Sequence, residues 1–182
     1  MAITPEEGAQ LVALARAALE AAARGEAMPD PPSIPVCCQH AGAFITLRKQ
    51  GELRGCIGQP EPGAALGELV VHCARAAALE DPRFSPVASG ELAVIDLEVS
   101  VLTPPVAVTD PSTIEVGRHG LIVARGGRRG LLLPQVAVEW GWNREEFLAH
   151  ACRKAGLPLD AWRHGAELFT FEAQIFEERR SP

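Results

Sequence analysis

The segment from residue 92 to residue 102 constrains the fold of this chain more than any other. Apolar and polar side chains take alternate positions there: Ile95, Asp96, Leu97, Glu98, Val99, Ser100 and Val101. Because successive side chains of a β-strand point to opposite faces, we predict a strand with one buried face and one polar face. Such strands are typical of antiparallel sheets that are covered on one side only.

Other periodic patterns predict helices and further strands that are joined locally. Helices are expected over about 5–24, 66–81, 135–140 and 144–155, and strands over 43–48, 120–124, 130–133 and 167–177. Thr4 is the expected N-cap of the first helix, with Glu7 completing a capping box. Strands do not alternate regularly with helices, so we predict an α+β fold with a mostly antiparallel sheet flanked by helices. No linker divides the chain, which favours a single domain over 1–182.

The charge balance excludes several classes of partner. The 182 residues carry a net charge of −6, whereas nucleic acids and anionic membranes bind basic surfaces. We therefore predict no nucleic-acid partner and no docking on anionic membranes. A membrane span is not expected either, because no apolar stretch approaches the ~20 residues that a span needs. No secretion signal is recognised at the N-terminus. A cytoplasmic protein is expected, with its five cysteines as free thiols.

The hexapeptide 53–58, with the sequence LRGCIG, concentrates candidate chemistry in one place. Arg54 offers a five-donor fork for a carboxylate or phosphate, and its charge favours the thiolate form of Cys56. Gly55 and Gly58 tolerate a positive φ and allow a ligand to approach the backbone closely. We expect a loop there that forms a binding site for a small anionic ligand.

Each of these assignments has a structural alternative. Cys56 is a candidate nucleophile with His119 as its base, or a small side chain that fills a buried pocket. Arg54 is a candidate anion clamp, or one partner of a structural ion pair. Glu98 is a candidate general base beside Ser100 as a ligand-binding residue, or both residues lie on the wet side of a sheet.

Three more groups of residues have side chains that could bind a ligand or a metal. Gln135, in the first turn of a helix, is a candidate ligand-binding residue or caps its own backbone. Asp81 and Arg83 flank a proline and are expected to form a local ion pair. Cys37, Cys38 and His40 lack the second pair of ligands that a structural zinc site needs, so we predict no metal and no other cofactor.

With these segments placed, the chain resembles the AMMECR domain family, whose prokaryotic members are called AmmeMemoRadiSam system protein A. The hexapeptide matches the family signature as it stands. Further matches follow in family order at Gly42–Leu47, Asp81–Phe84, Glu98–Leu102, Gly117–Leu121, Leu132–Ala137 and Lys154–Leu157. The resemblance covers about 42–177 and implies a larger sheet-and-helix part, a smaller lobe, and a cleft between them at the 53–58 loop.

The family has no assigned biochemical activity, so two hypotheses are carried forward. In the first, the protein is an enzyme that acts on a small anionic ligand: Arg54 holds the anion, Cys56 attacks, and Glu98 or His119 moves protons. In the second, it is a non-catalytic adaptor in which Cys56 is structural. Its family association implies Memo-type and radical-SAM proteins as partners.

Overall fold

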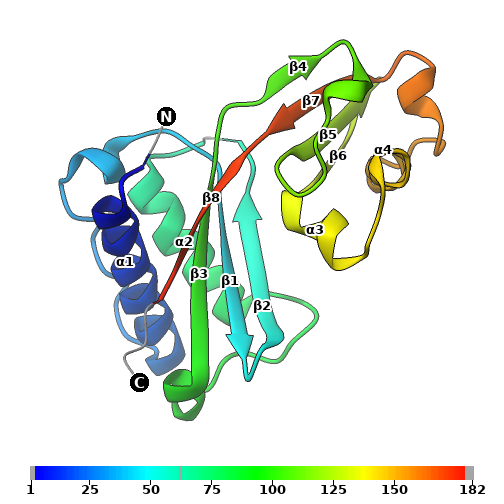
Figure 1. Cartoon of the computed structure of the whole chain (residues 1–182). Coiled ribbons are helices and arrows are strands. Elements are labelled where there is room, and N and C mark those ends of the chain that lie inside the picture. The colour runs from blue at the N-terminus through cyan, green and yellow to red at the C-terminus, as the bar shows by residue number, and fades with distance from the viewer. Residues whose placement is uncertain (1–2, 62, 179–182) are drawn as a thin grey trace. The chain divides into compact units, whose positions relative to one another are not determined.

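The computed structural model describes residues 3–61 and 63–178, and the chain forms two compact units (Figure 1). The first unit contains the described residues up to Leu102 together with those from Gln174 onward. The second unit is Thr103–Ala173, inserted between two strands of the first unit's sheet. The first unit therefore depends on pairing between segments that are far apart in the sequence.

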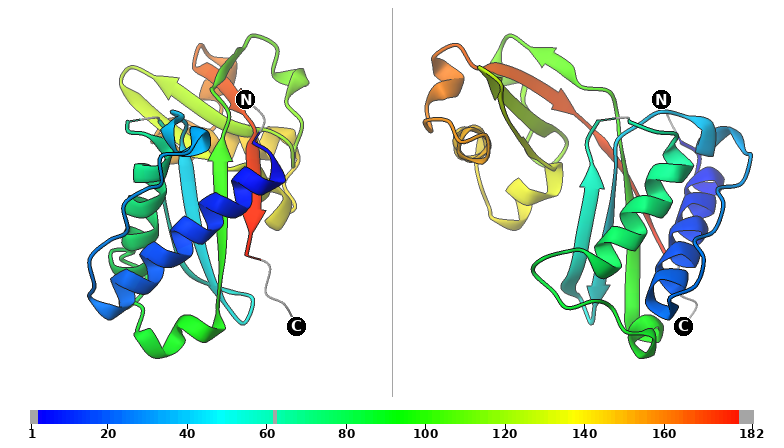
Figure 2. Two further views of the ribbon diagram at one scale, coloured as in Figure 1. Left: turned by 90° about the vertical axis from the view of Figure 1, so that its left-hand side faces the viewer. Right: turned by 180° about the vertical axis from the view of Figure 1, so that it is seen from behind.

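The first unit is a four-stranded sheet with helices on one face (Figure 2). Its strand order is β2-β1-β3-β8, which leaves β2 and β8 at the two edges. Its elements are α1 (Pro5–Arg24), η1 (Pro35–Cys38), β1 (Ala43–Lys49), β2 (Glu52–Gln59), α2 (Leu66–Leu79), η2 (Ser89–Val94), β3 (Ile95–Leu102) and β8 (Ala173–Glu177).

Local sequence signals place α1 as expected. The hydroxyl of Thr4 accepts a hydrogen bond from the Glu7 N–H at 3.2 Å, and the Glu7 carboxylate accepts one from the Thr4 N–H at 2.9 Å. Gly25 ends the helix in the left-handed conformation, at φ 69°. The predicted capping box is confirmed, and it satisfies backbone donors that the first turn would otherwise leave unpaired.

The alternation in β3 produces the two faces that the sequence predicts. In the antiparallel pairing with β1, Val99 lies opposite Ile45, and both are fully buried in the core beneath the helices. On the other face, Glu98 lies opposite Thr46. The register thus brings polar side chains from neighbouring strands onto one surface of the sheet.

The second unit has its own sheet and core. Its strand order is β4-β7-β5-β6. Its apolar core centres on Phe147 and Leu148 of α4 with Leu121 and Val123 of β5. The elements are β4 (Val106–Val108), η3 (Pro111–Thr113), β5 (Gly120–Arg125), β6 (Arg128–Leu132), α3 (Pro134–Glu139), α4 (Arg144–Lys154), η4 (Ala161–Arg163) and β7 (Glu167–Phe171).

The α+β class is confirmed, since the structure has two antiparallel sheets with helices. One boundary differs from the prediction: the expected single strand over 167–177 is two strands in different sheets, β7 and β8. The chain changes sheet at Glu172, where its carbonyl accepts the Thr103 N–H at 2.8 Å and its N–H donates to the Thr103 hydroxyl at 2.8 Å. Among the described residues, no helix is long and apolar enough to cross a membrane.

Candidate functional site

The hexapeptide 53–58 is not a loop but the middle of β2, an edge strand. Gly55 and Gly58 do not have positive φ. A Cβ on Gly55 would lie 2.3 Å from the Ala77 carbonyl oxygen of α2, and one on Gly58 would lie 2.2 Å from Cγ of Phe44. The glycines therefore let α2 and the Phe44 ring pack closely on the strand. The prediction of a loop was wrong, because close packing inside a strand requires glycine as strictly as a turn does.

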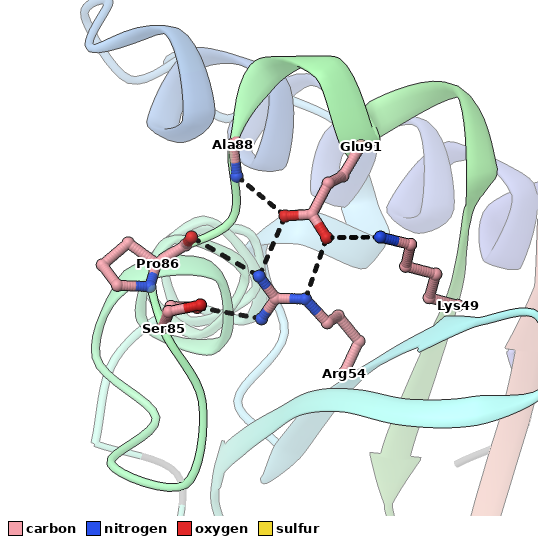
Figure 3. A network of polar contacts seen from close by, with 6 residues as sticks. All are labelled: Lys49, Arg54, Ser85, Pro86, Ala88 and Glu91. Atoms are coloured by element: carbon pink, nitrogen blue, oxygen red, sulfur yellow. Dashed lines mark hydrogen bonds and ion pairs between the residues drawn. The ribbon is translucent and has the colours of Figure 1, made fainter.

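The guanidinium of Arg54 is hydrogen-bonded to other residues of the first unit (Figure 3). Its Nε and Nη2 donate to the two carboxylate oxygens of Glu91 at 3.2 and 2.9 Å, and Nη1 donates to the Ser85 carbonyl at 2.9 Å. Nη2 also reaches the Pro86 carbonyl at 3.4 Å. Four of the five N–H donors of the guanidinium are used in this way, and the side chain is only 13% exposed.

Glu91, the partner of Arg54, was not found by sequence reasoning. Its carboxylate also accepts hydrogen bonds from Lys49 Nζ at 2.8 Å and from the Ala88 N–H at 3.1 Å. The hydrogen bonds from Arg54 and then Lys49 lower the pKa of Glu91 to about 2. Arg54 and Glu91 are 37 positions apart, and no linear pattern links them.

Cys56 is held through its backbone as well as its thiol. Its N–H donates to Asp81 Oδ2 at 2.9 Å, and its carbonyl accepts from Arg83 Nη2 at 3.4 Å. The thiol lies 3.5 Å from the Thr46 hydroxyl. Burial raises the pKa of the Cys56 thiol above its ordinary value, and this outweighs the hydrogen bond with Thr46 and the charge of Arg83, which lower it. The thiol is therefore protonated at neutral pH.

Asp81 and Arg83 form the expected ion pair, at 2.7 Å between Nη2 and Oδ2. The pair does more than hold its own turn, because it also occupies the outward N–H and C=O of Cys56. Asp81 is only 4% exposed, and its hydrogen bond with Arg83 holds its pKa far below the usual range. This pair caps the β2 edge of the sheet at Cys56, where these backbone groups would otherwise have no partner.

Two more predicted site residues lie on the same sheet face as Cys56. Thr46 pairs in register with Cys56 on one side and with Glu98 on the other. The Ser100 hydroxyl donates to Glu98 Oε1 at 3.0 Å. The structure thus brings Cys56, Glu98 and Ser100 together around Thr46, a residue that sequence reasoning did not single out. Arg54 is engaged elsewhere, with η2 and the segment before it.

His119 and Gln135, the remaining predicted site residues, belong to the second unit. Nδ1 of His119 accepts the Glu115 N–H at 3.0 Å, so the neutral ring carries its proton on Nε2. Gln135 lies in the first turn of α3, and its buried Oε1 has no hydrogen-bond partner among the described residues. Their catalytic and ligand-binding roles stay predictions. Within the described part of the chain, no three metal-ligating side chains gather at one point.

Comparison with known proteins places the chain in a family. A model of the AMMECR1 family matches residues 12–176. A protein of Thermofilum pendens is 49% identical, over 97% of this chain and 92% of its own length. One of Methanothermobacter thermautotrophicus is 50% identical, over 97% and 96%. The crystal structure of an uncharacterized protein from Pyrococcus horikoshii has a TM-score of 0.90 at 45% identity, covering 97% of this chain and 94% of that one.

Proposed function

The chain belongs to the AMMECR1 family, and on that premise we propose that it is a non-catalytic binding protein whose hexapeptide 53–58 is part of the scaffold. The observation that carries this proposal is the engagement of Arg54. An anion clamp needs a guanidinium fork that is open to a ligand. Here the fork is occupied by Glu91 and two backbone carbonyls.

The environment of Cys56 supports the same proposal. A cysteine nucleophile acts as the thiolate and is found where neighbouring charge lowers its pKa. Burial has the opposite effect on Cys56, and the charges of Glu98 and Asp81 add to it. Of the two polar or reactive side chains of the hexapeptide, Arg54 is thus hydrogen-bonded within the fold, and Cys56 lacks the surroundings that stabilise a thiolate.

A second candidate function is an enzyme acting on a small anionic ligand, with Cys56 and Glu98 at its centre. One observation favours it: Cys56, Glu98 and Ser100 share one face of the sheet with Thr46. The charge of Glu98 opposes it, because a carboxylate beside the thiol repels an anion. This face is better suited to a neutral or cationic group.

The partners that the family association implies, a Memo-type protein and a radical-SAM protein, provide the test. Each is taken from the same genome and titrated with the wild-type chain and with Cys56→Ala, and complex formation is followed by sedimentation velocity. We expect at least one to bind both forms with the same affinity. Failure of both proteins to bind would refute these partners. Binding that is lost in Cys56→Ala, together with conversion of a small anion by the wild type, would establish the enzyme instead.

A further inference from the structure

Residues of α1 and β8 line a groove in the first unit. The ribbons of these two elements are dark blue and red in Figure 2. We propose that this groove binds a basic, extended segment of a partner protein, which adds a strand to the sheet at β8. The proposal rests on the binding-protein function and names the surface that would carry it. It uses none of the residues of the hexapeptide.

The first step is the direction of the backbone groups of β8. Hydrogen bonds from the Thr103 N–H to the Glu172 carbonyl and from the Glu178 N–H to the Leu97 carbonyl fix the register with β3. Successive residues of a strand point their backbone groups to alternate sides. The N–H and C=O groups of Ala173, Ile175 and Glu177 therefore point away from β3. Within the described residues, no strand pairs with this edge.

The two edges of the sheet differ in how they are protected. At β2, Asp81 and Arg83 occupy the outward N–H and C=O of Cys56. At β8, no hydrogen bond to the outward groups of Ala173, Ile175 or Glu177 is present among the described residues. Proteins usually cover or block an open edge because it templates strand addition. Because hydrogen bonds cap the β2 edge at Cys56 and the β8 edge is open, we infer that the β8 edge pairs with a partner strand.

The groove beside this edge has an apolar floor and room for a peptide. Its volume is about 1650 Å³. Pockets for small molecules hold roughly 300–1,000 Å³, so a longer ligand fits it better. Val12 and Phe176 contribute apolar surface, and Ala9, Ala13 and Ala17 of α1 leave space above it. Ile175 is 46% exposed at the rim.

The charges at the groove select the partner. Four carboxylates line it, against the single guanidinium of Arg16. Arg16 is itself neutralised by Glu178, with Nε donating to Oε1 at 2.8 Å. Glu20 pairs with Arg24, while Glu6 and Glu177 have no ionic partner among the described residues. The groove is acidic, so it attracts lysine or arginine side chains and repels a second copy of itself.

The proposal thus describes β-strand addition, in which main-chain hydrogen bonds supply affinity and side chains supply selectivity. Phe176 faces Gly8 of α1, so its neighbour Glu177 points to the other face of the sheet. A fitting segment alternates apolar residues, which face α1, with basic residues on the same face as Glu177. A second copy of this chain would place acidic rims against each other. Its pairing is therefore an outcome of the test rather than the expectation.

The experiment uses a fluorescent, end-blocked seven-residue peptide of alternating lysine and valine, with alternating glutamate and valine as its matched control. Binding to the full chain is measured by anisotropy at low and at high salt. We expect the lysine peptide to bind, the glutamate peptide to bind at least tenfold more weakly, and the difference to shrink as salt screens the charges. Equal binding of the two peptides, or none, overturns the proposal.

Ile175→Pro and Ile175→Ala then test the geometry. Proline removes an N–H that points away from β3, so the ladder to β3 keeps its hydrogen bonds. Alanine keeps that N–H and shortens the side chain. Ile175→Pro should bind the lysine peptide at least fivefold more weakly than Ile175→Ala does, about the contribution of one backbone hydrogen bond. Equal affinity of the two variants refutes strand addition.

If Ile175→Pro does not fold, hydrogen exchange on the wild type decides. The amides of Ala173, Ile175 and Glu177 should exchange quickly alone and slowly with the lysine peptide. Exchange that the lysine peptide leaves unchanged refutes the proposal. If the same amides are protected by dimerisation that depends on protein concentration, the β8 edge instead pairs with a second copy of this chain. Cys56→Ala should leave peptide binding unchanged, so failure here is distinct from failure of the non-catalytic assignment.

Discussion

Replacing Arg54 with lysine separates a structural role from a ligand-binding role. Lysine keeps the positive charge but has no planar fork, so it cannot contact both oxygens of Glu91 and two carbonyls at once. The ammonium retains at most part of the network that the guanidinium makes with Glu91, Ser85 and Pro86. We expect the folded state of Arg54→Lys to be destabilised even when no ligand is present.

The magnitude follows from the exposure of the pair. Hydrogen bonds to charged groups contribute about 1.5–3 kcal/mol, whereas fully exposed ion pairs contribute about 0–1 kcal/mol. The side chains of Arg54 and Glu91 are 13% and 20% exposed, which places them between these limits. The expected loss in the free energy of unfolding is about 1–3 kcal/mol. At roughly 2–4 °C per kcal/mol for a chain of this size, Tm should fall by several degrees.

Urea unfolding followed by far-UV circular dichroism is the appropriate assay. Tryptophan fluorescence alone would report on the second unit, because Trp140, Trp142 and Trp162 all lie in it. Arg75→Lys is the matched control, since Arg75 forms an exposed ion pair with Glu80, with side chains 43% and 49% exposed. Its expected loss is below about 0.5 kcal/mol.

Two results together would refute this reasoning. They are an Arg54→Lys variant that is as stable as the wild type, and a rise in Tm on adding phosphate or sulfate that occurs in the wild type but not in the variant. That outcome would mean that Arg54 is available to an anion and that Glu91 is not its main partner. Ligand-dependent protection is diagnostic because only a ligand that binds the native state stabilises it.

Two further predictions concern the same network and strand. Because the pKa of Glu91 is lowered to about 2, ionised Glu91 stabilises the fold above its usual pKa, and this stabilisation is lost as pH falls toward 2. Glu91→Gln should therefore be less stable than the wild type at pH 6, and the gap should close between about pH 4.5 and pH 2; a gap that widens on acidification contradicts the assignment. Gly55→Ala places a Cβ 2.3 Å from the Ala77 carbonyl oxygen and should cost about 2 kcal/mol or more in urea unfolding. Gly90→Ala, where nothing lies within 4 Å of the new Cβ, should be nearly neutral, and an equal loss in both variants would exclude close packing as the cause.

Local patterns predicted the α-helices and most strands, but they missed β2 and β4 and some boundaries. The alternation in β3 and the capping box at Thr4 and Glu7 depend on neighbours within a few residues, and both are present in the structure. The alternation over 167–177 continues through Glu172, yet the chain leaves one sheet for the other there. The side-chain pattern is the same in either sheet, so it carries no information about that change.

The candidate site shows a different limit. The sequence pattern placed Glu98 and Ser100 on the polar face of one strand and Cys56 in the hexapeptide, and the register of three strands brings all three onto one face. For Arg54 it left an anion clamp and a structural ion pair both open, because the ion-pair partner Glu91 is 37 positions away in the sequence. Gly55 and Gly58 indicated a close approach, but the group that approaches is part of the protein itself.

The pH dependence of Cys56 alkylation tests the central claim most directly. In a Cys38→Ser background, Cys56 is the only thiol that is not buried, so iodoacetamide should modify it first. A structural Cys56 should react with a midpoint above the ~8.5 of free cysteine, since burial raises its pKa. A midpoint well below that value would show a stabilised thiolate at the hexapeptide and would contradict the assignment of 53–58 as scaffold.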